Sequence, residues 1–324
     1  MMVINLIKRN IKLFFKDKGM FFTALITPGI LLVLYATFLG NVYKDSFMQG
    51  LPEGLLISED IIDGLVASQL ISSILAVSCV TVSFCANFLM VQDKANGTIK
   101  DLRIAPVKSS VLSISYYIAT IISTLIICYS ALILSLIYVA IMGWYLSFAD
   151  VLLLLLDTTL VVLFGTAISS LINYFISTQG QISAVGTIVS AGYGFICGAY
   201  MPIYSFSDGL QKVVSFLPGT YATSLFRNHA MRGVFDELSS IGMPEEVLTG
   251  MKDMLDYNFY FFGNEVNILS KYLILIVSII VIVGIYIVLN ATKIKKVWYN
   301  KLWWWWYEVS WIRRNVFRNN TCNE

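Results

Sequence analysis

Six long runs of apolar residues constrain the fold of this 324-residue chain more than any other feature. About twenty apolar residues form a helix long enough to cross the hydrocarbon core of a bilayer, which is roughly 30 Å thick. Hydrophobic residues make up 57% of the sequence and charged residues 13%, far below the charged share of a soluble domain. We therefore predict an all-α polytopic membrane protein with six transmembrane helices, at about 21–40, 68–91, 111–142, 151–176, 182–200 and 271–290.

Composition also argues against several classes of protein. The net charge is only +2, and the basic residues flank the apolar runs instead of forming one basic face, so we expect no nucleic-acid partner. The five cysteines are scattered without a CxxC pair, which is typical of small core residues rather than of a metal or disulfide site. The dipeptide Gly-Lys does not occur in the sequence, so the chain has no phosphate-binding loop of the nucleotide-hydrolase type. We expect a chain that is not an enzyme and binds no cofactor or metal of its own.

The distribution of Lys and Arg predicts the orientation of the chain. Most of the 22 basic residues lie in the segments 1–20, 92–110 and 291–324. Few lie in the segments of the opposite side, at 41–67, 143–150 and 201–270. Because cytoplasmic loops are enriched in Lys and Arg, both termini are predicted to be cytoplasmic. The compact format and the Ile-, Lys- and Asn-rich composition favour a bacterial cell membrane.

The two ends of the chain have their own patterns. Residues 1–20 place Ile and Phe on one helical face and basic residues, including Lys8 and Lys12, on the other, which predicts an amphipathic helix at the inner membrane surface. The tail 291–324 mixes basic residues with a run of Trp. Since Trp favours the headgroup layer, an anchor at the inner surface is the favoured interpretation, and a tail that docks a partner is the alternative.

The loop 92–110 between the second and third apolar runs is the most charged of the cytoplasmic loops between spans. Asn96-Gly97 predicts a turn, and Thr98 with Asp101 three residues later resembles a capping box. Pro106 ends the helix that this pattern starts. We therefore expect a short helix in the membrane plane, a rigid element on which a cytosolic partner could act.

The external segment 201–270 is not simply polar. Residues 201–226 are apolar but interrupted by Pro202, Pro218 and Gly219, a pattern that predicts a pair of re-entrant half-helices. The stretch after Pro244 carries two Glu and then apolar residues at helical spacing, which predicts a small amphipathic helix.

Two ionisable residues remain to be placed. Asp157 lies within the fourth apolar run, where an unpaired carboxylate is costly. It is interpreted as a carboxylate that reaches the interface or bonds to Ser or Thr hydroxyls; a proton or cation site is the alternative. His229 is the single histidine of the chain, and it is interpreted as an ordinary polar residue of an external loop.

Three features together resemble the membrane permease of type-2 ATP-binding-cassette (ABC) exporters. They are the loop "QDKANGTIKDLRIAPV" at 92–107, the stretch "CGAYMPIYSFSDGLQKVVSFLPGTYATSLFR" at 197–227, and the plan of an amphipathic helix followed by six spans. The family usually opens the loop with a Glu and a basic residue, and this chain has Asp93-Lys94 there. The resemblance implies a permease domain at 21–290 that pairs with a second permease. Separate ABC ATPase subunits would bind ATP and Mg.

The resemblance also implies roles for particular residues. Contact with the ATPase would involve Lys8, Lys12, Asp93, Lys94, Gly97, Thr98, Lys100, Asp101 and Arg103. In this family the first, second and fifth spans surround the substrate route, so its lining would include Tyr35, Phe38, Asn87 and Tyr193. Pro202, Pro218 and Gly219 would belong to an outer gate. Gly194 and Gly198 form a GxxxG pattern in the fifth span, which would pack at the dimer seam or within the subunit.

The predicted function is therefore export of a hydrophobic or amphipathic substrate, such as a drug, an antimicrobial peptide or a lipid-like molecule. A lipid-linked polysaccharide is an alternative substrate. A secondary transporter driven by an ion gradient is disfavoured because the sequence shows no internal repeat and no second intramembrane charge. The sequence leaves open whether the second permease is an identical chain or a homologue.

Overall fold

A computed structural model describes residues 2–50, 57–104, 107 and 109–291, and this part of the chain is predominantly helical. The predicted tail at 291–324 lies outside the described residues except for its first one. The helices are α1 (Met2–Lys16), α2 (Lys18–Leu34), η1 (Tyr35–Leu39), α3 (Gly40–Gly50), α4 (Glu59–Ala95), α5 (Thr98–Ile104), α6 (Ser109–Met142), α7 (Phe148–Phe175), α8 (Gln179–Ile196), η2 (Ile203–Ser205), α9 (Asp208–Val214), α10 (Pro218–Ser240), α11 (Glu245–Met254) and a last helix, Ile268–Ala291. Two short strands, β1 (Tyr260–Phe261) and β2 (Asn264–Glu265), form an antiparallel hairpin.

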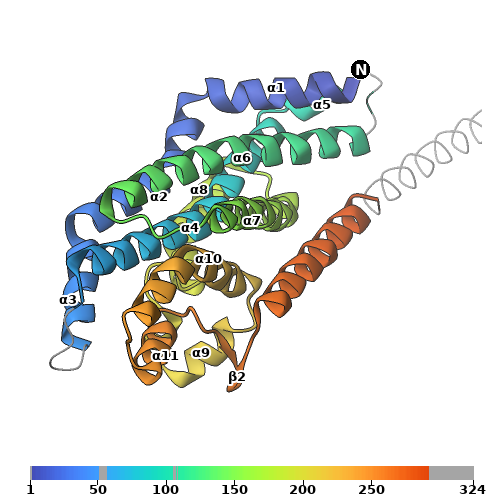
Figure 1. The fold of residues 1–324 in the computed structure, drawn as a ribbon. Helices are drawn as coiled ribbons and strands as arrows, with labels where there is room; N and C mark the ends of the chain where they lie inside the picture. Colours follow the sequence, from blue (N-terminus) through green and yellow to red (C-terminus); the bar gives the residue numbers. More distant parts are fainter. Residues whose placement is uncertain (1, 51–56, 105–106, 108, 292–324) are drawn as a thin grey trace, which may run out of the picture.

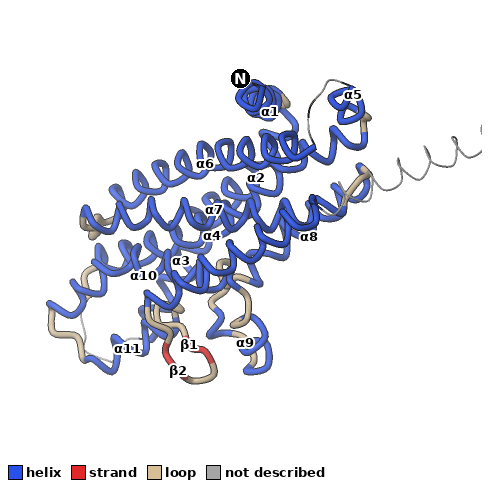
Figure 2. Tube along the Cα trace, turned by 90° about the vertical axis from the view of Figure 1, so that its right-hand side faces the viewer, coloured by secondary structure: helices blue, strands red, loops and turns tan. Residues whose placement is uncertain are grey.

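Helix α4 is the centre of the molecule. It packs against α2, α6, α7, α8 and α10, and Figures 1 and 2 both show it enclosed by these helices. Small residues allow this close packing: a Cβ on Gly165 of α7 would lie 2.8 Å from the carbonyl oxygen of Cys79 in α4. Ser and Thr hydroxyls along α4 bond back to carbonyls of the preceding turn, as Ser83 does to Cys79 at 2.7 Å. The helix can therefore be buried on every side although it carries many polar atoms.

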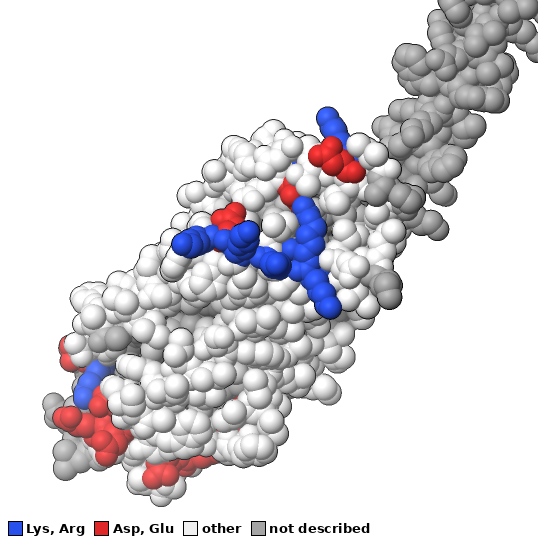
Figure 3. Space-filling view, turned by 90° about the horizontal axis from the view of Figure 1, so that it is seen from above, with Lys and Arg blue, Asp and Glu red and all other residues white. Residues whose placement is uncertain are grey.

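The two ends of the bundle differ in character. Helices α1 and α5 lie together at one end, whereas α9, α11 and the β1–β2 hairpin form a layer at the other (Figure 1). Lys and Arg side chains gather over the α1 end, as Figure 3 shows. Exposed Lys8, Lys12 and Lys16 of α1 contribute to this basic surface, and Phe14 on the opposite face of α1 is buried against the bundle.

Five helices of the described part are long and apolar enough to cross a membrane. They are Lys18–Asp45, Glu59–Ala95, Ser110–Met142, Phe148–Phe175 and Ile268–Ala291. The predicted fifth span, 182–200, corresponds to α8, which is helical and packs on α4 but is not among these five. Two Gln residues and four Gly residues within its 18 positions lower its apolar character.

The segment predicted as a pair of re-entrant half-helices contains one helical turn and two helices of unequal length, and its re-entrant course stays a prediction. Pro202 precedes the single turn η2, a seven-residue helix α9 follows, and Pro218 starts α10, which continues for 23 residues. The prediction took the prolines as breaks within a re-entrant pair, but Pro218 occupies the first turn of a long helix, where its missing N–H costs nothing. The amphipathic helix predicted after Pro244 is confirmed as α11, with Pro244 at its N-cap.

Candidate functional site

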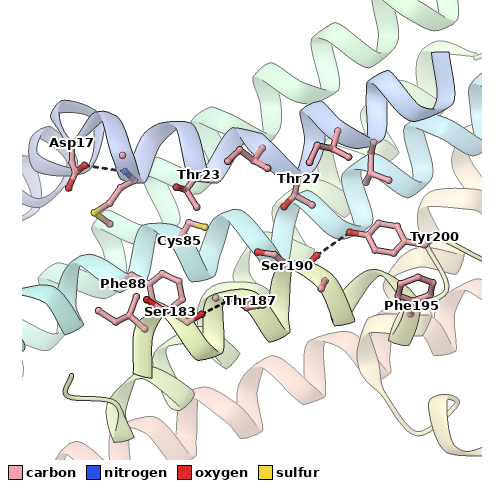
Figure 4. Close-up of a pocket in the computed structure, with 18 of the residues that line it drawn as sticks. Asp17, Thr23, Thr27, Cys85, Phe88, Ser183, Thr187, Ser190, Phe195 and Tyr200 are labelled. Atoms are coloured by element: carbon pink, nitrogen blue, oxygen red, sulfur yellow. Dashed lines mark hydrogen bonds between the residues drawn. The ribbon is translucent and has the colours of Figure 1, made fainter. Parts of the chain in front are cut away.

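A cavity of about 1000 Å³ lies between α2, α4 and α8. Figure 4 shows its labelled side chains: Thr23 and Thr27 come from α2, Cys85 and Phe88 from α4, and Ser183, Thr187 and Ser190 from α8. Asp17 lies at the end nearest α1, and Phe195 and Tyr200 lie at the opposite end; Gln92 of α4 is also a lining residue.

The wall of the cavity is mainly apolar with a sparse set of hydroxyl groups. The Thr187 hydroxyl donates to the Ser183 carbonyl at 2.9 Å, and the Tyr200 hydroxyl donates to the Ser190 carbonyl at 3.2 Å. Those two donors are thereby satisfied within the chain, while their oxygens can still accept hydrogen bonds. Asp17 is the single charged residue among the described lining residues, and its carboxylate accepts a bond from the Met20 amide at 3.1 Å. Such a cavity suits a largely apolar molecule that carries a few polar groups.

The cavity lies between helices of the three segments that the resemblance implied, α2, α4 and α8, but two of the four predicted lining residues, Phe38 and Asn87, do not line it. Phe38 is 64% exposed and Asn87 is 2% exposed, and neither lines the cavity. The Asn87 amide donates instead to Ser169 and Ser170 of α7, at 3.1 and 2.8 Å.

The other two predicted lining residues can be placed only in part. Tyr193 is not a lining residue, and its ring packs on Gly219, where a Cβ would lie 2.8 Å from the phenol oxygen. Tyr35 lies in η1, and its side chain is outside the described part. The predicted gate residue Gly219 is therefore in contact with a predicted lining residue, away from the cavity wall.

Three helices are tied together at the end of the cavity nearest α1. Arg9 of α1 pairs with Asp93 of α4 at 2.9 Å, and the Tyr116 hydroxyl of α6 donates to the same carboxylate at 2.5 Å. Burial disfavours the charged form of Arg9, but the hydrogen bond and the negative charge of Asp93 outweigh it, so the pKa of the Arg9 guanidinium is raised. Asp93 therefore joins α1, α4 and α6 instead of projecting into solvent.

The next residues of the loop 92–110 make separate contacts. The Lys94 ammonium donates to the Asn173 and Ile176 carbonyls at the C-terminal end of α7, at 2.8 and 3.3 Å, where the helix dipole favours a cation. Gly97 has a φ of 81°, a conformation that favours glycine, and it ends the turn from α4 into α5.

Helix α5 confirms that a short helix starts at Thr98. Lys100 and Asp101 on this helix are exposed, as are Lys8 and Lys12 on α1 nearby. Arg103 also lies on α5, but its side chain is outside the described part. Of the residues predicted to contact the ATPase, Asp93 and Lys94 instead make contacts within the subunit, whereas another set is exposed on α1 and α5.

Comparison with protein-family models matches residues 2–230 to the ABC-2 type transporter family. The chain belongs to this family. No curated protein matches it. Membrane domains of ABC-2 transporters are permease components that lack the ATPase motifs, and they generally work with ATPase subunits.

The ABC-2 permease also contains a buried polar network that the sequence reading missed. Arg227 of α10 is fully buried and pairs with Asp256 at 2.6 Å, while its second nitrogen donates to the Gly198 carbonyl at 2.6 Å. Burial raises the pKa of the Asp256 carboxyl, although the charge of Arg227 opposes this shift. The Lys271 ammonium donates to Ser224 and Asn228, also on α10, at 2.9 and 2.7 Å.

His229 belongs to a separate buried contact of α10, and its prediction as an ordinary loop residue was wrong. It is 3% exposed on α10, with Nδ1 2.6 Å from the Asp157 carboxylate of α7. Asp157 is 0% exposed and bonds to the His229 imidazole and the Tyr272 hydroxyl, so neither expected environment, the interface or Ser and Thr hydroxyls, is observed. The sequence signal was the stretch "TYATSLFRNHA", in which hydroxyl and charged residues alternate with apolar ones along a segment taken for a half-helix and loop.

The predicted GxxxG contact of the permease has a different geometry. Gly198 lies beyond the end of α8, in a turn with a φ of 76°, and a Cβ there would lie 2.7 Å from Ile203. Gly194 packs directly against the Tyr200 ring. The two glycines therefore do not share a helical face, and each faces a side chain of its own subunit.

Proposed function

We propose that this ABC-2 permease is the membrane subunit of an ATP-driven exporter whose substrate is hydrophobic or amphipathic. The observation that carries the proposal is the cavity between α2, α4 and α8, which is apolar, about 1000 Å³ in volume and open along one side. Such a volume accommodates a drug-sized or lipid-like molecule. In this proposal α8 crosses the membrane as a sixth span beside the five longer apolar helices.

A second permease would complete the cavity wall. Large apolar side chains on the free faces of α2 and α8 are exposed, including Ile26, Ile30, Ile188 and Phe195. A second copy or a homologous chain packed on these faces would enclose the cavity between two subunits. The expectation of a dimer therefore depends on these exposed faces of α2 and α8 and not on Gly194 and Gly198.

Coupling to the ATPase would use the α1 and α5 end. ATP and Mg would bind to the partner subunits, and their movement would act on exposed Lys8, Lys12, Lys100 and Asp101. From there the Arg9–Asp93 and Lys94–α7 contacts connect α1 and α7 to α4, which is 37 residues long and reaches the opposite end of the bundle. Displacement of α4 would change the width of the cavity that it lines.

This proposal places the α1 end in the cytoplasm of a bacterial cell, consistent with the basic surface in Figure 3. Membrane-impermeant amine labelling of intact cells tests it. Lys212 of α9 is exposed at the opposite end and should be labelled from outside, whereas exposed Lys100 of α5 should be labelled only after lysis. Labelling of Lys100 in intact cells would refute the orientation and, with it, the coupling role of α5.

The cavity can be tested with one substitution in its wall and one outside it. Thr187 of α8 lines the cavity, whereas Ile137 of α6 is 53% exposed and is not a lining residue. Thr187→Trp should fill the cavity and reduce substrate-stimulated ATP hydrolysis by the reconstituted complex at least about tenfold, or ~1.4 kcal/mol. Ile137→Trp adds bulk outside the cavity and should leave stimulation within about twofold.

The substrate panel should include a cationic drug, an antimicrobial peptide and a phospholipid analogue. Equal losses in the two Trp variants would refute the cavity as the substrate route. Folded protein in both variants, shown by an unchanged elution volume in detergent, is required for the comparison.

A further inference from the structure

Side chains from two other helices meet Asp157 of α7, a carboxylate that is 0% exposed. Asp157 Oδ2 lies 2.6 Å from His229 Nδ1 of α10, and the Tyr272 hydroxyl of the last helix donates to Asp157 Oδ1 at 2.5 Å. The imidazole and phenol rings are stacked, with 6.2 Å between their centroids. The two carboxylate oxygens are thus both engaged, one by each neighbouring helix.

Asp157 has no Lys or Arg partner among the described residues. Lys271 is adjacent to Tyr272 in sequence, but its ammonium bonds to Ser224 and Asn228. Arg227, two residues before His229, is directed to Asp256 and the Gly198 carbonyl. The Cys79 thiol of α4 also interacts with Asp157, and Cys128 of α6 interacts with Cys79, but a thiol cannot supply a positive charge.

This arrangement sets the charge of the site. With a neutral imidazole and an ionised carboxylate, the site would carry an uncompensated negative charge in a buried position, which is strongly unfavourable. One additional proton removes the net charge, whether it lies on the imidazole or on the carboxylate. A buried carboxylate and imidazole 2.6 Å apart provide two positions for that proton along a single hydrogen bond.

We propose that Asp157, His229 and Tyr272 form a proton-binding site that holds the helix Ile268–Ala291 against α7 and α10. Only 11% of the most apolar stretch of this helix is buried, so the polar contact contributes much of its attachment to the bundle. When the proton leaves, the site carries a net negative charge. Hydration of that charge is then more favourable than the hydrogen bond from the Tyr272 hydroxyl. The first turns of the helix then separate from α7. This inference concerns the charge state of the protein alone and does not depend on which substrate is exported.

The single histidine of the sequence makes the proton state directly measurable. The full-length chain, purified with a histidine-free tag and labelled with ¹⁵N histidine, gives one imidazole spectrum in lipid nanodiscs. At about pH 7.5 we expect the pair to hold the additional proton, as an imidazolium or as a neutral ring whose Nδ1 accepts from a protonated Asp157. A neutral ring protonated at Nδ1 would leave a bare carboxylate and would overturn the proposal.

Hydrogen–deuterium exchange of residues 268–275 tests the structural consequence. From about pH 6 to about pH 9, wild-type exchange should rise at least about threefold beyond the intrinsic rate increase, because loss of the proton releases the start of the helix. Asp157→Asn has no charge to lose and should show the intrinsic increase only.

Tyr286→Phe, a change on the same helix but away from the site, should behave as the wild type does. Equal pH dependence in Asp157→Asn and the wild type would overturn the role of the proton in holding the helix.

Discussion

Helices α2 and α4 have similar apolar character, and both belong to segments long enough to cross a membrane, yet their positions in the molecule are opposite. Every residue in the most apolar stretch of α4 is buried, whereas only 19% of the corresponding stretch in Lys18–Asp45 is buried. One helix is the core of the subunit, and the other contributes one wall of a cavity and an exposed apolar face.

The difference lies in side-chain size and hydrogen bonding, not in hydrophobicity. The buried surface of α4 is rich in Ser, Thr, Ala and Cys, and Asn87 and Gln69 are also buried there. Between Lys18 and Leu34, α2 carries larger Phe, Ile and Leu side chains and only two Thr. Without a hydrophobic driving force between helices in lipid, close packing and interhelical hydrogen bonds determine which helix is enclosed. Apolar content thus predicts insertion into the membrane, whereas small and hydroxyl residues predict position within the bundle.

The largest effect should come from adding bulk at the α4–α7 contact. Gly165→Leu would place atoms within 3 Å of the Cys79 carbonyl and Val80 backbone, so α7 must move away from α4. We expect a loss of about 3 kcal/mol in the free energy of unfolding, with most of the protein aggregated on purification. Thermal unfolding in detergent and gel filtration measure this.

Gly29→Leu is the matched change on α2, since a Cβ there meets no atom within 4 Å. It should leave stability unchanged in the isolated subunit. If both variants lost stability equally, the contrast between a packed α4 and a free α2 face would be wrong.

An intermediate effect is expected at Asn87. Asn87→Ala removes two buried hydrogen bonds to Ser169 and Ser170 and should cost about 1–3 kcal/mol, again measured by thermal unfolding. Thr23→Ala, in the cavity wall on α2, should cost less than about 0.5 kcal/mol. An Asn87→Ala variant of normal stability but altered substrate response would support the sequence-based prediction of a lining role instead.

The sequence predicted local elements well because their signals are local. The start of α5 at Thr98, the turn at Gly97 and the amphipathic α11 each follow from residues within one or two turns. The lining of the cavity did not follow, because the face that a membrane helix presents to a neighbour is set by packing between distant segments. His229 and Asp157 are 72 residues apart, and no local pattern connects them. Arg227 was part of the motif that carried the family resemblance, yet its burial depends on Asp256, which the chain supplies after α11.

A smaller effect on stability than that of Asn87→Ala should come from the ion pair between α1 and α4, although its effect on transport should be large. The Arg9 side chain is 28% exposed and that of Asp93 is 10% exposed, so water screens the pair in part. Asp93→Asn keeps an acceptor for the Tyr116 hydroxyl and removes the charge, and we expect a loss of about 1 kcal/mol or less. If α1 passes force from an ATPase to α4 through this pair, the ratio of transport to ATP hydrolysis should fall severalfold in the reconstituted complex. Asp101→Asn on exposed α5 is the control for removal of a loop charge, and it should weaken ATPase binding without changing that ratio. A normal ratio in Asp93→Asn would show that α4, despite its central position, receives no force from α1 through this pair.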